Sequence, residues 1–544
     1  MIATHERRPW VLPTSAALIV LAILALWIGA QCLRRTEGSL TYAQDDAYIH
    51  MAMSKNLVMH GTWGVTPGAY SASSSSPLWT LLLAASFSVF GIRDSLPLVL
   101  NVLFAVASVG LLGLILHRVG APSELIFAAQ AAFILAVPLV MVIAVGMEHT
   151  LQALLTLLTV GLCARLIRTP SNGVRDTLMM GVAAGLMVAT RYEGLFVIAG
   201  CSAALFMFRR PLQAVAAALA GAVPVIAVGV LNLSQGWFFL PASIVMKRAA
   251  LQHSILSSGF WYGALETMIH VRPPIAIVAV ALAALTLSAH QSWHRVHGRW
   301  WAIEPELLIV LVASLLHSML ADFAWLGRYE AYLIALGVMA VAVALQRTHA
   351  AGHLSLTRNP WSTRAVAAAL AFCAIGVLGR AQGLNAAVPA AAQNIYEQQR
   401  QMARFIGTYY DASTVVLNDI GAVGYYTNAG IIDVFGLGSL DVARARIARR
   451  FDGSTVEGLA EPRHVAAALF HESWLKRAGV FPERWIRVAT WTISDNVACG
   501  DKTVSLFAPD PGTARILADR AARFRSALPP GVEVATFSNH ERQP

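Results

Sequence analysis

Long apolar runs recur along most of the chain, and short polar connections separate them. About eleven runs are suited to crossing a membrane as helices, a crossing that takes roughly 20 residues. We expect these spans at residues 10–33, 94–116, 125–145, 150–167, 177–190, 194–208, 212–233, 273–289, 307–320, 329–345 and 365–378. The run at 77–91 is shorter, and we expect a helix that dips into the outer leaflet and returns. The pattern predicts a polytopic α-helical membrane protein.

The connections between the runs predict the orientation in the membrane. Basic residues gather in HERR, HRVGAPSE, RLIRTPSNGVRD, FRRP, HQSWHRVHGRWW and QRTHAAGHLSLTRNPWSTR. All of these segments fall on one side if the spans alternate, and short basic loops face the cytoplasm. We therefore expect a multi-pass membrane protein with a cytoplasmic N-terminus, and we expect residues after 380 to lie outside.

The pattern changes after residue 380, where charged residues become more frequent. Strand-like runs such as TVVLNDI and GIIDVFGL alternate with YEQQRQMARFIGTYY and EPRHVAAALFHESWLKRAGV, which we expect to be helical. We expect a membrane domain at residues 1–380 and an extracytoplasmic α/β domain at 381–544, with a frayed end at LPPGVEVATFSNHERQP. Residues 34–93 form the first extracytoplasmic loop.

Composition agrees with the membrane class. Of 544 residues, 57% are hydrophobic and 13% are charged, about half the charge of a typical soluble protein. The net charge of +10 is spread over short loops, and no basic segment interleaved with aromatic residues indicates nucleic-acid binding. The first run ends at two arginines without a small-residue cleavage site, which favours a retained helix over a signal peptide.

An adjacent acidic pair, Asp45 and Asp46, opens the segment that follows the first span. Ile49, Met53 and Leu57 recur every four residues after it, which predicts an amphipathic helix on the outer membrane surface. An acidic residue at a helix start is often a simple cap favoured by the helix dipole. One acidic residue is enough for a cap, so the second needs another explanation.

Other polar residues stand at outer span ends. Each on its own is typical of an interfacial anchor. Together they would place carboxylates beside fixed cations, which suits a base and a clamp for a lipid-borne phosphate. The segments are GMEHT with Glu148, ATRYEG with Arg191, FFLPASIVMKR with Ser243, Lys247 and Arg248, and DFAWLGRYEAY with Arg328 and Tyr329.

These segments resemble the glycosyltransferases of the GT-C superfamily, which use polyprenyl-phosphate-linked sugars at the outer face of the membrane. The likeness is nearest to bacterial members of the DDAYI form, such as the terminal β-1,2-arabinofuranosyltransferases of mycobacterial cell walls. It rests on DDAYI, SASSSSPLWTLL, GMEHT, LPASIVMK, WLGRYEAYL and NDIGAVGYYTNAGIIDVFGLGS, in that order along most of the chain.

The resemblance implies that Asp45 or Asp46 is the catalytic base, with Asp45 preferred, and that the other carboxylate orients the base or the acceptor. It also implies a donor-phosphate contact for Lys247, although LPAS replaces the more usual LPNT and leaves Ser243 as the hydroxyl there. The remaining substrate-binding residues that we expect are Arg328, Tyr329, Glu148, Arg191, Arg248 and His50.

The implied reaction is inverting transfer of a sugar, with arabinofuranose as one candidate, to a cell-envelope acceptor. Lys and Arg can balance the phosphate charge, so no obligate metal is expected, although the acidic pair is compatible with one divalent ion. A GT-C enzyme that uses a hexose or aminosugar on lipid A, protein or polysaccharide is an alternative. A lipid-linked sugar flippase is another, and it predicts midplane charges and internal repeats.

Overall fold

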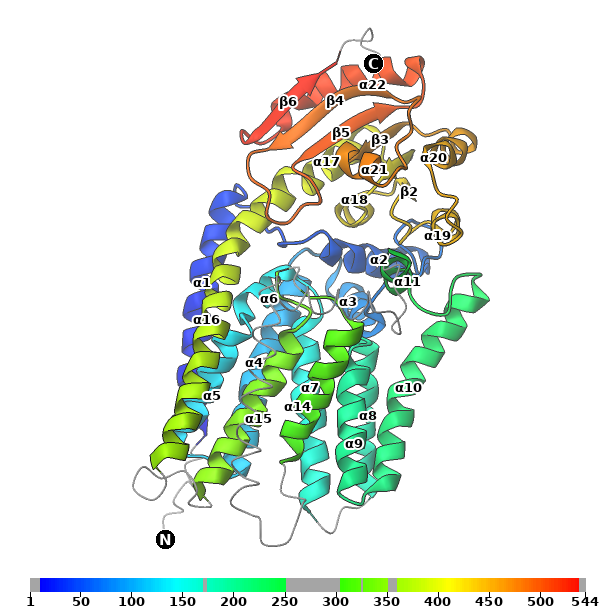
Figure 1. The fold of residues 1–544 in the computed structure, drawn as a ribbon. Coiled ribbons are helices and arrows are strands. Elements are labelled where there is room, and N and C mark those ends of the chain that lie inside the picture. Colours follow the sequence, from blue (N-terminus) through cyan, green and yellow to red (C-terminus); the bar gives the residue numbers. More distant parts are fainter. Residues whose placement is uncertain (1–9, 170–173, 251–303, 324–325, 351–359, 538–544) are drawn as a thin grey trace.

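The computed structural model describes residues 10–169, 174–250, 304–323, 326–350 and 360–537 of the chain. Helices stand side by side in a bundle, and a smaller domain built on a β-sheet lies over one end of it (Figure 1). The predicted span at 273–289 and the basic segments HERR and HQSWHRVHGRWW lie outside the described residues.

The bundle and its connecting helices occupy the first part of the chain. A helix covers most of each predicted span that falls within the described residues, and helix α3 forms at the predicted shorter run. The bounds are α1 Val11–Arg35, α2 Asp46–His60, α3 Pro77–Phe90, α4 Leu96–Arg118, α5 Ser123–Ala136, α6 Leu139–Val145, α7 His149–Arg168, α8 Val174–Thr190, α9 Gly194–Met207, α10 Pro211–Ser234, α11 Ala242–Ala250, α14 Pro305–Leu320, α15 Ala331–Ala350 and α16 Pro360–Glu397.

Six described helices are long and apolar enough to cross a membrane, and the number is seven if the bent pair α5 and α6 counts as one span. The pair bends by 44°, and three further apolar helices have only 10–17 residues. The expected count of eleven spans is therefore not confirmed. Large side chains such as Leu212 and Ile375 are exposed on the outer helices, as expected of surfaces that face lipid.

Ion pairs with buried glutamates connect the helices at the end of the bundle that lies away from the sheet. Arg168, at the end of α7, donates two hydrogen bonds of 2.6 Å to Glu306 and one of 2.7 Å to Glu304. Gln346 of α15 donates to the carbonyl of Gly120 nearby. Helix α2, which begins at Asp46, lies at the other end of the bundle, beside the sheet domain (Figure 1).

Helix α2 does not lie on an exposed membrane surface, so that prediction is wrong. Every residue from 47 to 56 is buried, including polar His50 and Lys55. The helix lies across the end of the bundle, with α3 below it and α18 of the sheet domain above it (Figure 1). Because it has neighbours on opposite sides, its sequence lacks a single apolar face.

Close packing with Tyr42 fixes the segment that leads into α2. The Tyr42 ring lies where a Cβ on Gly146 would come within 2.3 Å, and the φ of Gly146 is +74°. Glycine is therefore required there on both counts. The Tyr42 hydroxyl also donates to the carbonyl of Asp94 at 2.5 Å, which joins this segment to the start of α4.

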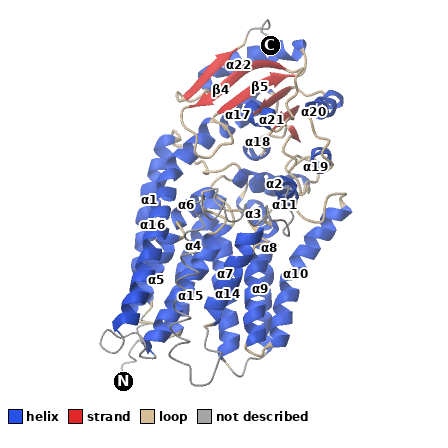
Figure 2. Cartoon of the chain, viewed as in Figure 1, coloured by secondary structure: helices blue, strands red, loops and turns tan. Residues whose placement is uncertain are grey.

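The α/β domain that the sequence predicts is present and contains a six-stranded sheet (Figure 2). The strand order is β2-β1-β3-β5-β4-β6; the first three strands are parallel and the others antiparallel. The bounds are α17 Gln399–Tyr409, β1 Thr414–Leu417, α18 Gly421–Tyr426, β2 Gly430–Asp433, α19 Leu440–Ile447, α20 Gly453–Ala460, η1 Glu461–Arg463, β3 Ala467–Phe470, α21 Glu472–Arg477, β4 Ile486–Ile493, β5 Thr503–Ala508, α22 Pro511–Phe524, η2 Arg525–Ala527 and β6 Val532–Thr536. Helix α16 runs unbroken through residue 381, so the chain reaches this domain as a helix.

Two local predictions for this domain are wrong. Residues Ala467–Phe470, expected to be helical, form the buried strand β3 between β1 and β5. Alanine favours helices, but pairing on both sides in a buried sheet overrides that preference. Residues Val532–Thr536, expected to be frayed, form β6 and pair with β4.

Gly421 gives a test of how tightly the two domains fit. A Cβ at this position would lie 2.1 Å from the carbonyl oxygen of Asp45. We expect Gly421→Ala to destabilise the protein by about 1–3 kcal/mol, because one of the two backbones must move. Thermal unfolding and limited proteolysis of the purified protein measure this loss.

Gly458→Ala in α20 is the matched control, because nothing lies within 4 Å of the added methyl group. Alanine there should leave the melting temperature unchanged or raise it slightly. Equal melting temperatures for the two variants would contradict the close fit of α18 against Asp45.

Candidate functional site

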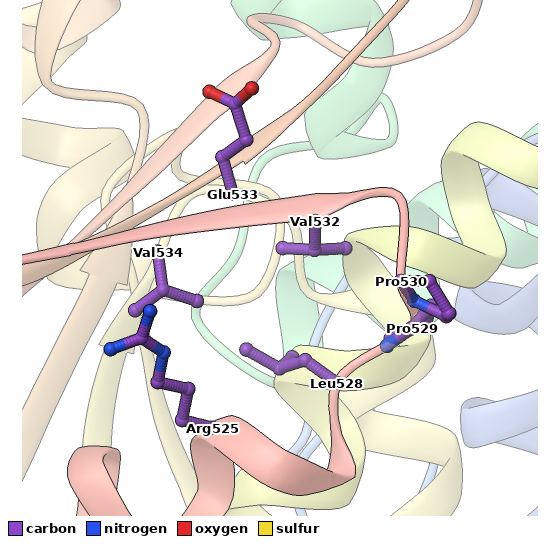
Figure 3. A pocket seen from close by; sticks show the side chains of 7 residues that line it. All are labelled: Arg525, Leu528, Pro529, Pro530, Val532, Glu533 and Val534. Carbon is purple, nitrogen blue, oxygen red and sulfur yellow. The ribbon is translucent and has the colours of Figure 1, made fainter.

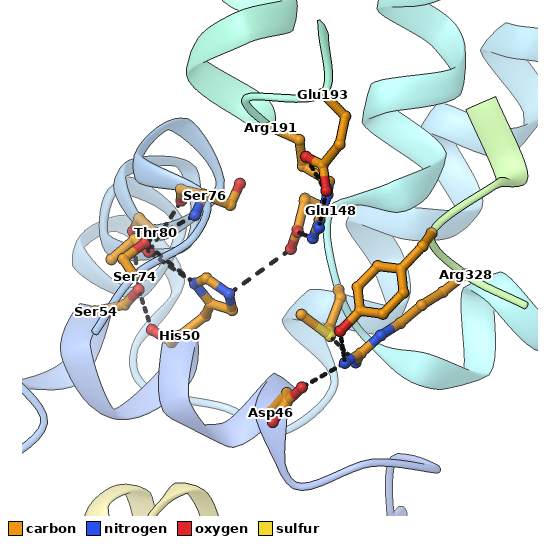
Figure 4. Close-up of polar contacts among 12 residues, drawn as sticks. Asp46, His50, Ser54, Ser74, Ser76, Thr80, Glu148, Arg191, Glu193 and Arg328 are labelled. Atoms are coloured by element: carbon orange, nitrogen blue, oxygen red, sulfur yellow. Dashed lines mark hydrogen bonds and ion pairs between the residues drawn. The ribbon is translucent and has the colours of Figure 1, made fainter. Parts of the chain in front are cut away.

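The two adjacent aspartates turn toward different parts of the protein. Asp46 is the first residue of α2, and its carboxylate pairs with Arg328 at 2.5 Å between Oδ2 and Nη2. The Asp46 side chain is 47% exposed, whereas that of Arg328 is 3% exposed. Successive side chains at a helix start point about 100° apart, which accounts for the divergence. Asp46 therefore keeps access to solvent while it contacts a buried cation (Figure 4).

Tyr329 lies between two guanidinium groups. The central carbon of Arg328 is 5.0 Å from the ring centroid, and that of Arg191 is 5.3 Å from it. The segment just before α15 thus meets the loop between α8 and α9. The structure therefore brings together Arg191, Arg328 and Tyr329, three of the residues expected to bind the donor.

Carboxylates balance these cations. Arg191 pairs with Glu148 at 2.7 Å and with Glu193 at 2.6 Å. Glu148 is fully buried at the residue before α7, and its Oε2 lies 3.7 Å from Nε2 of His50 on α2 (Figure 4). The network therefore runs from α2 to the start of α9 through buried side chains.

His50 also contacts the serine-rich turn. Its Nδ1 lies 3.0 Å from the hydroxyl of Thr80 and 3.5 Å from that of Ser74. Burial lowers the pKa of His50, although Glu148 acts in the opposite direction. A neutral imidazole fits this position, where one ring nitrogen faces hydroxyl groups and the other a carboxylate.

Asp45 is bound to the sheet domain. Its two carboxylate oxygens accept hydrogen bonds from the backbone N–H groups of Gly421 at 2.7 Å and Ala422 at 2.8 Å, at the start of α18. Asp45 therefore does cap a helix, but one that is 376 residues away in the sequence. Its side chain makes no capping hydrogen bond to its own helix.

The other end of α18 is bound by Lys55, from the same helix α2. The Lys55 ammonium donates to the carbonyls of Tyr425 at 2.9 Å and Thr427 at 2.6 Å. Gly424 lets α18 approach α2 and the segment after it, since a Cβ there would lie 3.3 Å from Cβ of Ala52 and 2.7 Å from Val65. Helix ends leave such backbone groups unsatisfied, so α2 supplies partners at both ends of α18.

Asp94, just before α4, adds a second connection between the domains. Its carboxylate accepts hydrogen bonds from the hydroxyls of Tyr425 at 2.9 Å and Tyr426 at 2.6 Å. Arg400 of α17 lies 3.4 Å from the same carboxylate. The sheet domain is thus held to the bundle by side chains on both sides of the boundary.

The remaining expected residues lie on α11. The positions of Lys247 and Arg248 fall in this helix, but their side chains lie outside the described residues. The hydroxyl of Ser243 is buried and has no hydrogen-bond partner in the described structure. A donor-phosphate contact by Lys247 stays a prediction.

Sequence reasoning missed Lys55, Asp94 and the tyrosine pair of α18, whereas Glu193 belongs to the polar ATRYEG segment at a predicted outer span end. Lys55 could have been noticed in the sequence, because a lysine among the apolar residues of α2 needs a polar partner if that helix is buried. The partner itself is a pair of backbone carbonyls, which no side-chain pattern reveals.

The surroundings of Asp45 change its ionisation. Removal of the carboxyl group from water raises its pKa to about 8, and the Asp419 carboxylate acts in the same direction. The N–H groups of Ala422 and Gly421 oppose this shift. Asp45 therefore holds a proton at neutral pH more readily than an ordinary aspartate does.

Metal ligation and pockets were considered for the same region. No group of three or more His, Cys, Asp and Glu side chains that could hold a metal ion occurs in the described parts of the chain. A pocket of about 490 Å³ lies on the sheet domain beside η2 and β6, bordered by Arg525 and Glu533 (Figure 3). None of the expected site residues lines it.

Comparisons with known proteins find one matching sequence family and several structures of similar fold. Residues 393–507 match a family described as a domain of unknown function (DUF8728). A search of curated proteins finds no match. The structure of ArnT from Cupriavidus metallidurans in the apo state is 14% identical with a TM-score of 0.52, covering 92% of this chain and 99% of that chain. This chain therefore shares its fold with that ArnT structure.

Two other structures are similar at lower scores. The Archaeoglobus fulgidus oligosaccharyltransferase in the apo form is 13% identical, with a TM-score of 0.48 and coverage of 91% of this chain and 74% of that one. The arabinofuranosyltransferase AftD from Mycobacteria is 12% identical, with a TM-score of 0.42 and coverage of 90% and 39%.

The raised pKa of Asp45 predicts a pH dependence of stability. The folded protein binds the Asp45 proton up to about pH 8, whereas an unfolded aspartate releases it near pH 4. Stability from this group is full below pH 4 and is lost as the pH rises through about 8. Between pH 6 and 8, the melting temperature should therefore fall more steeply for the wild type than for Asp45→Asn.

Asp441→Asn is the control, since Asp441 pairs with Arg463 on the surface with its side chain 53% exposed. That variant should keep the wild-type slope. The same slope in Asp45→Asn as in the wild type would show that Asp45 is ionised throughout this pH range.

Proposed function

We propose that this protein is an inverting glycosyltransferase that moves a sugar from a polyprenyl-phosphate donor to a cell-envelope acceptor at the outer face of the bacterial inner membrane. The observation that carries the proposal is the contact between half-exposed Asp46 and buried Arg328, at the membrane-domain end that faces the sheet domain. A base and a phosphate-binding cation are the two groups that this reaction needs. The fold shared with ArnT supports the proposal.

Asp46 is the better candidate for the base, although the sequence favoured Asp45. Both oxygens of Asp45 are engaged by backbone N–H groups of α18. Asp46 keeps a large exposed surface, so an acceptor hydroxyl can reach its carboxylate. We therefore assign proton removal to Asp46 and the positioning of the α2 start to Asp45.

Arg328 has a role in leaving-group stabilisation. As the bond between the sugar and the phosphate breaks, negative charge develops on the phosphate, and a cation at that place lowers the barrier. Transfer of the Arg328 guanidinium from Asp46 to the incoming phosphate would release the carboxylate to act as the base. Arg191 and Lys247 are the further cations of this site, the second on the strength of the sequence resemblance alone.

Attack by the acceptor oxygen in line with the leaving phosphate inverts the anomeric centre. The base and the phosphate-binding cation then act on opposite faces of the sugar, so the contact between Asp46 and Arg328 has to break when the donor binds. In this scheme the acceptor oxygen forms the new glycosidic bond, its proton passes to Asp46, and the bonding electron pair leaves with the polyprenyl phosphate. The sheet domain binds or positions the acceptor, and arabinofuranose is the donor sugar suggested by the DDAYI form of the acidic segment.

The first prediction from this proposal concerns the two aspartates. Purified protein should transfer radiolabelled sugar from at least one member of a polyprenyl-phosphate donor panel that includes arabinofuranose and common hexoses. Asp46→Asn should reduce turnover about 100-fold or more, because general base catalysis contributes about that much. Donor binding should remain.

Asp45→Asn should lower turnover less than Asp46→Asn and should also lower thermal stability. A larger loss in Asp45→Asn, at unchanged stability, would return the base to Asp45. Absence of transfer and hydrolysis with every donor would contradict the enzyme and favour a lipid-linked sugar transporter.

The second prediction concerns the cation. Arg328→Gln should weaken binding of a polyprenyl phosphate about 10-fold or more, because a charge-assisted hydrogen bond to phosphate contributes about 1.5–3 kcal/mol. Tryptophan fluorescence or native mass spectrometry can measure the dissociation constant. Arg463→Gln, on the exposed surface of the sheet domain, is the control and should bind as the wild type does. Unaltered binding by Arg328→Gln would remove it from the donor site.

A further inference from the structure

Polar atoms without partners gather at the start of α7. They are Oε2 of Glu148, both ring nitrogens of His149, both amide atoms of Gln152 and Nε of Arg328. Within the described part of the chain, none of them has a partner at full hydrogen-bond geometry. Their polar neighbours there are weak ones: Gln152 interacts with the His149 ring, and Glu148 Oε2 lies 3.7 Å from Nε2 of His50. Glu148, His149 and Gln152 are fully buried and Arg328 is 2% exposed, so bulk solvent does not reach these residues.

Such a group of atoms is unusual, because a buried polar atom without a partner costs about 1–3 kcal/mol. Nearly all buried polar atoms in native proteins find a partner in the protein, in ordered water or in a ligand. Six neighbouring exceptions on four residues therefore point to a polar ligand at this place.

The atoms lie around one place. The rings of His149 and Tyr329 meet edge to face with centroids 6.4 Å apart, and Arg328 lies against the same tyrosine ring. Glu148 directly precedes His149, and Gln152 follows one helical turn later on the same face of α7. The unpartnered groups thus adjoin the arginine to which we assign the donor phosphate.

The chemistry of the atoms indicates the occupant. Arg328 Nε and the Gln152 amide nitrogen can donate hydrogen bonds, whereas Glu148 Oε2 and the Gln152 amide oxygen accept them; one nitrogen of a neutral His149 ring does each. A metal ion would require acceptors alone, and an apolar prenyl chain would leave every atom unsatisfied. Hydroxyl groups both donate and accept, so several hydroxyls on one ring match this mixture.

We propose that His149 and Gln152 form the subsite that binds the hydroxyl groups of the donor sugar, beside the phosphate at Arg328. The inference rests on the proposed function and adds the residues that recognise the sugar. Glu148 completes the subsite through its second carboxylate oxygen. Recognition of the sugar is then separate from recognition of the lipid phosphate, because different side chains carry the two tasks.

The test compares two lipids on the full-length protein: undecaprenyl phosphate alone, and undecaprenyl phosphate carrying arabinofuranose, glucose or mannose. The variants are His149→Phe and Gln152→Met, which keep the approximate size of each side chain and remove its hydrogen bonds. The measured quantity is the ratio of the dissociation constants of the bare lipid and the best-bound glycosylated lipid.

The unaltered protein should prefer one glycosylated lipid by about 10-fold or more, and each variant should lower that preference by about 5-fold or more, consistent with hydrogen bonds left unmade in a buried site. Affinity for the bare lipid should stay unchanged in both variants. This split distinguishes a sugar contact from a general loss of structure, which would weaken both lipids alike.

Thr159→Val is the matched control. Thr159 is a fully buried residue of α7 whose hydroxyl also lacks a partner in the described structure, but it lies about two turns deeper. Its substitution should leave the preference for sugar as it is.

Three outcomes would overturn the inference. One is a wild-type preference retained by both variants; another is an equal loss in Thr159→Val; the third is a wild type that binds bare and glycosylated lipids alike. Failure of the unaltered protein to bind any of the lipids is a different result, because it contradicts the proposed function itself.

Discussion

The arrangement of the candidate site depends on the way α2 holds the short helix α18. Asp45 binds the N–H groups at one end of α18 and Lys55 binds carbonyls at the other. Gly421 and Gly424 allow contacts that any side chain would prevent. Helix α2 is therefore fixed between the bundle and the sheet domain, and its first turn directs Asp46 at Arg328. The sheet domain therefore contributes to the geometry of the candidate site through its contacts with Asp45 and Lys55.

Features that depend on interactions within one segment were predictable from the sequence, and features that depend on contacts with distant segments were not. Apolar length identified the helices of the bundle, because burial in lipid acts on each segment separately. The chemistry of the site was suggested by its residue types, and Arg191, Arg328 and Tyr329 do meet. The partner of Asp45 was not predictable, because it is a pair of backbone N–H groups 376 residues away. The prediction of a helix at the residues of β3 was wrong for the same reason, since pairing with the neighbouring strands overrides the helix preference of an alanine-rich sequence.

Charge balance explains why so many ionisable groups can be buried together. Two guanidinium groups against one tyrosine ring repel each other, and each is compensated by carboxylates at hydrogen-bond distance. Three carboxylates face two arginines: Asp46, Glu148 and Glu193 against Arg191 and Arg328. The set has no positive excess of its own, so an incoming phosphate needs a further cation. In the proposed function that cation comes from α11, whose sequence carries adjacent Lys247 and Arg248.

The ion pair between Asp46 and Arg328 also bears on how the reaction is controlled. A carboxylate that is paired with a guanidinium is a weaker base, since the pair favours its ionised form. On the proposed function, arrival of the donor phosphate would offer Arg328 a second anion. The half-exposed carboxylate of Asp46 could then exchange the arginine for the acceptor hydroxyl. On the proposed function, the base therefore gains strength when the leaving group is in place. In this proposal, a buried cation with two alternative anions links donor binding to acceptor activation without a change in the fold.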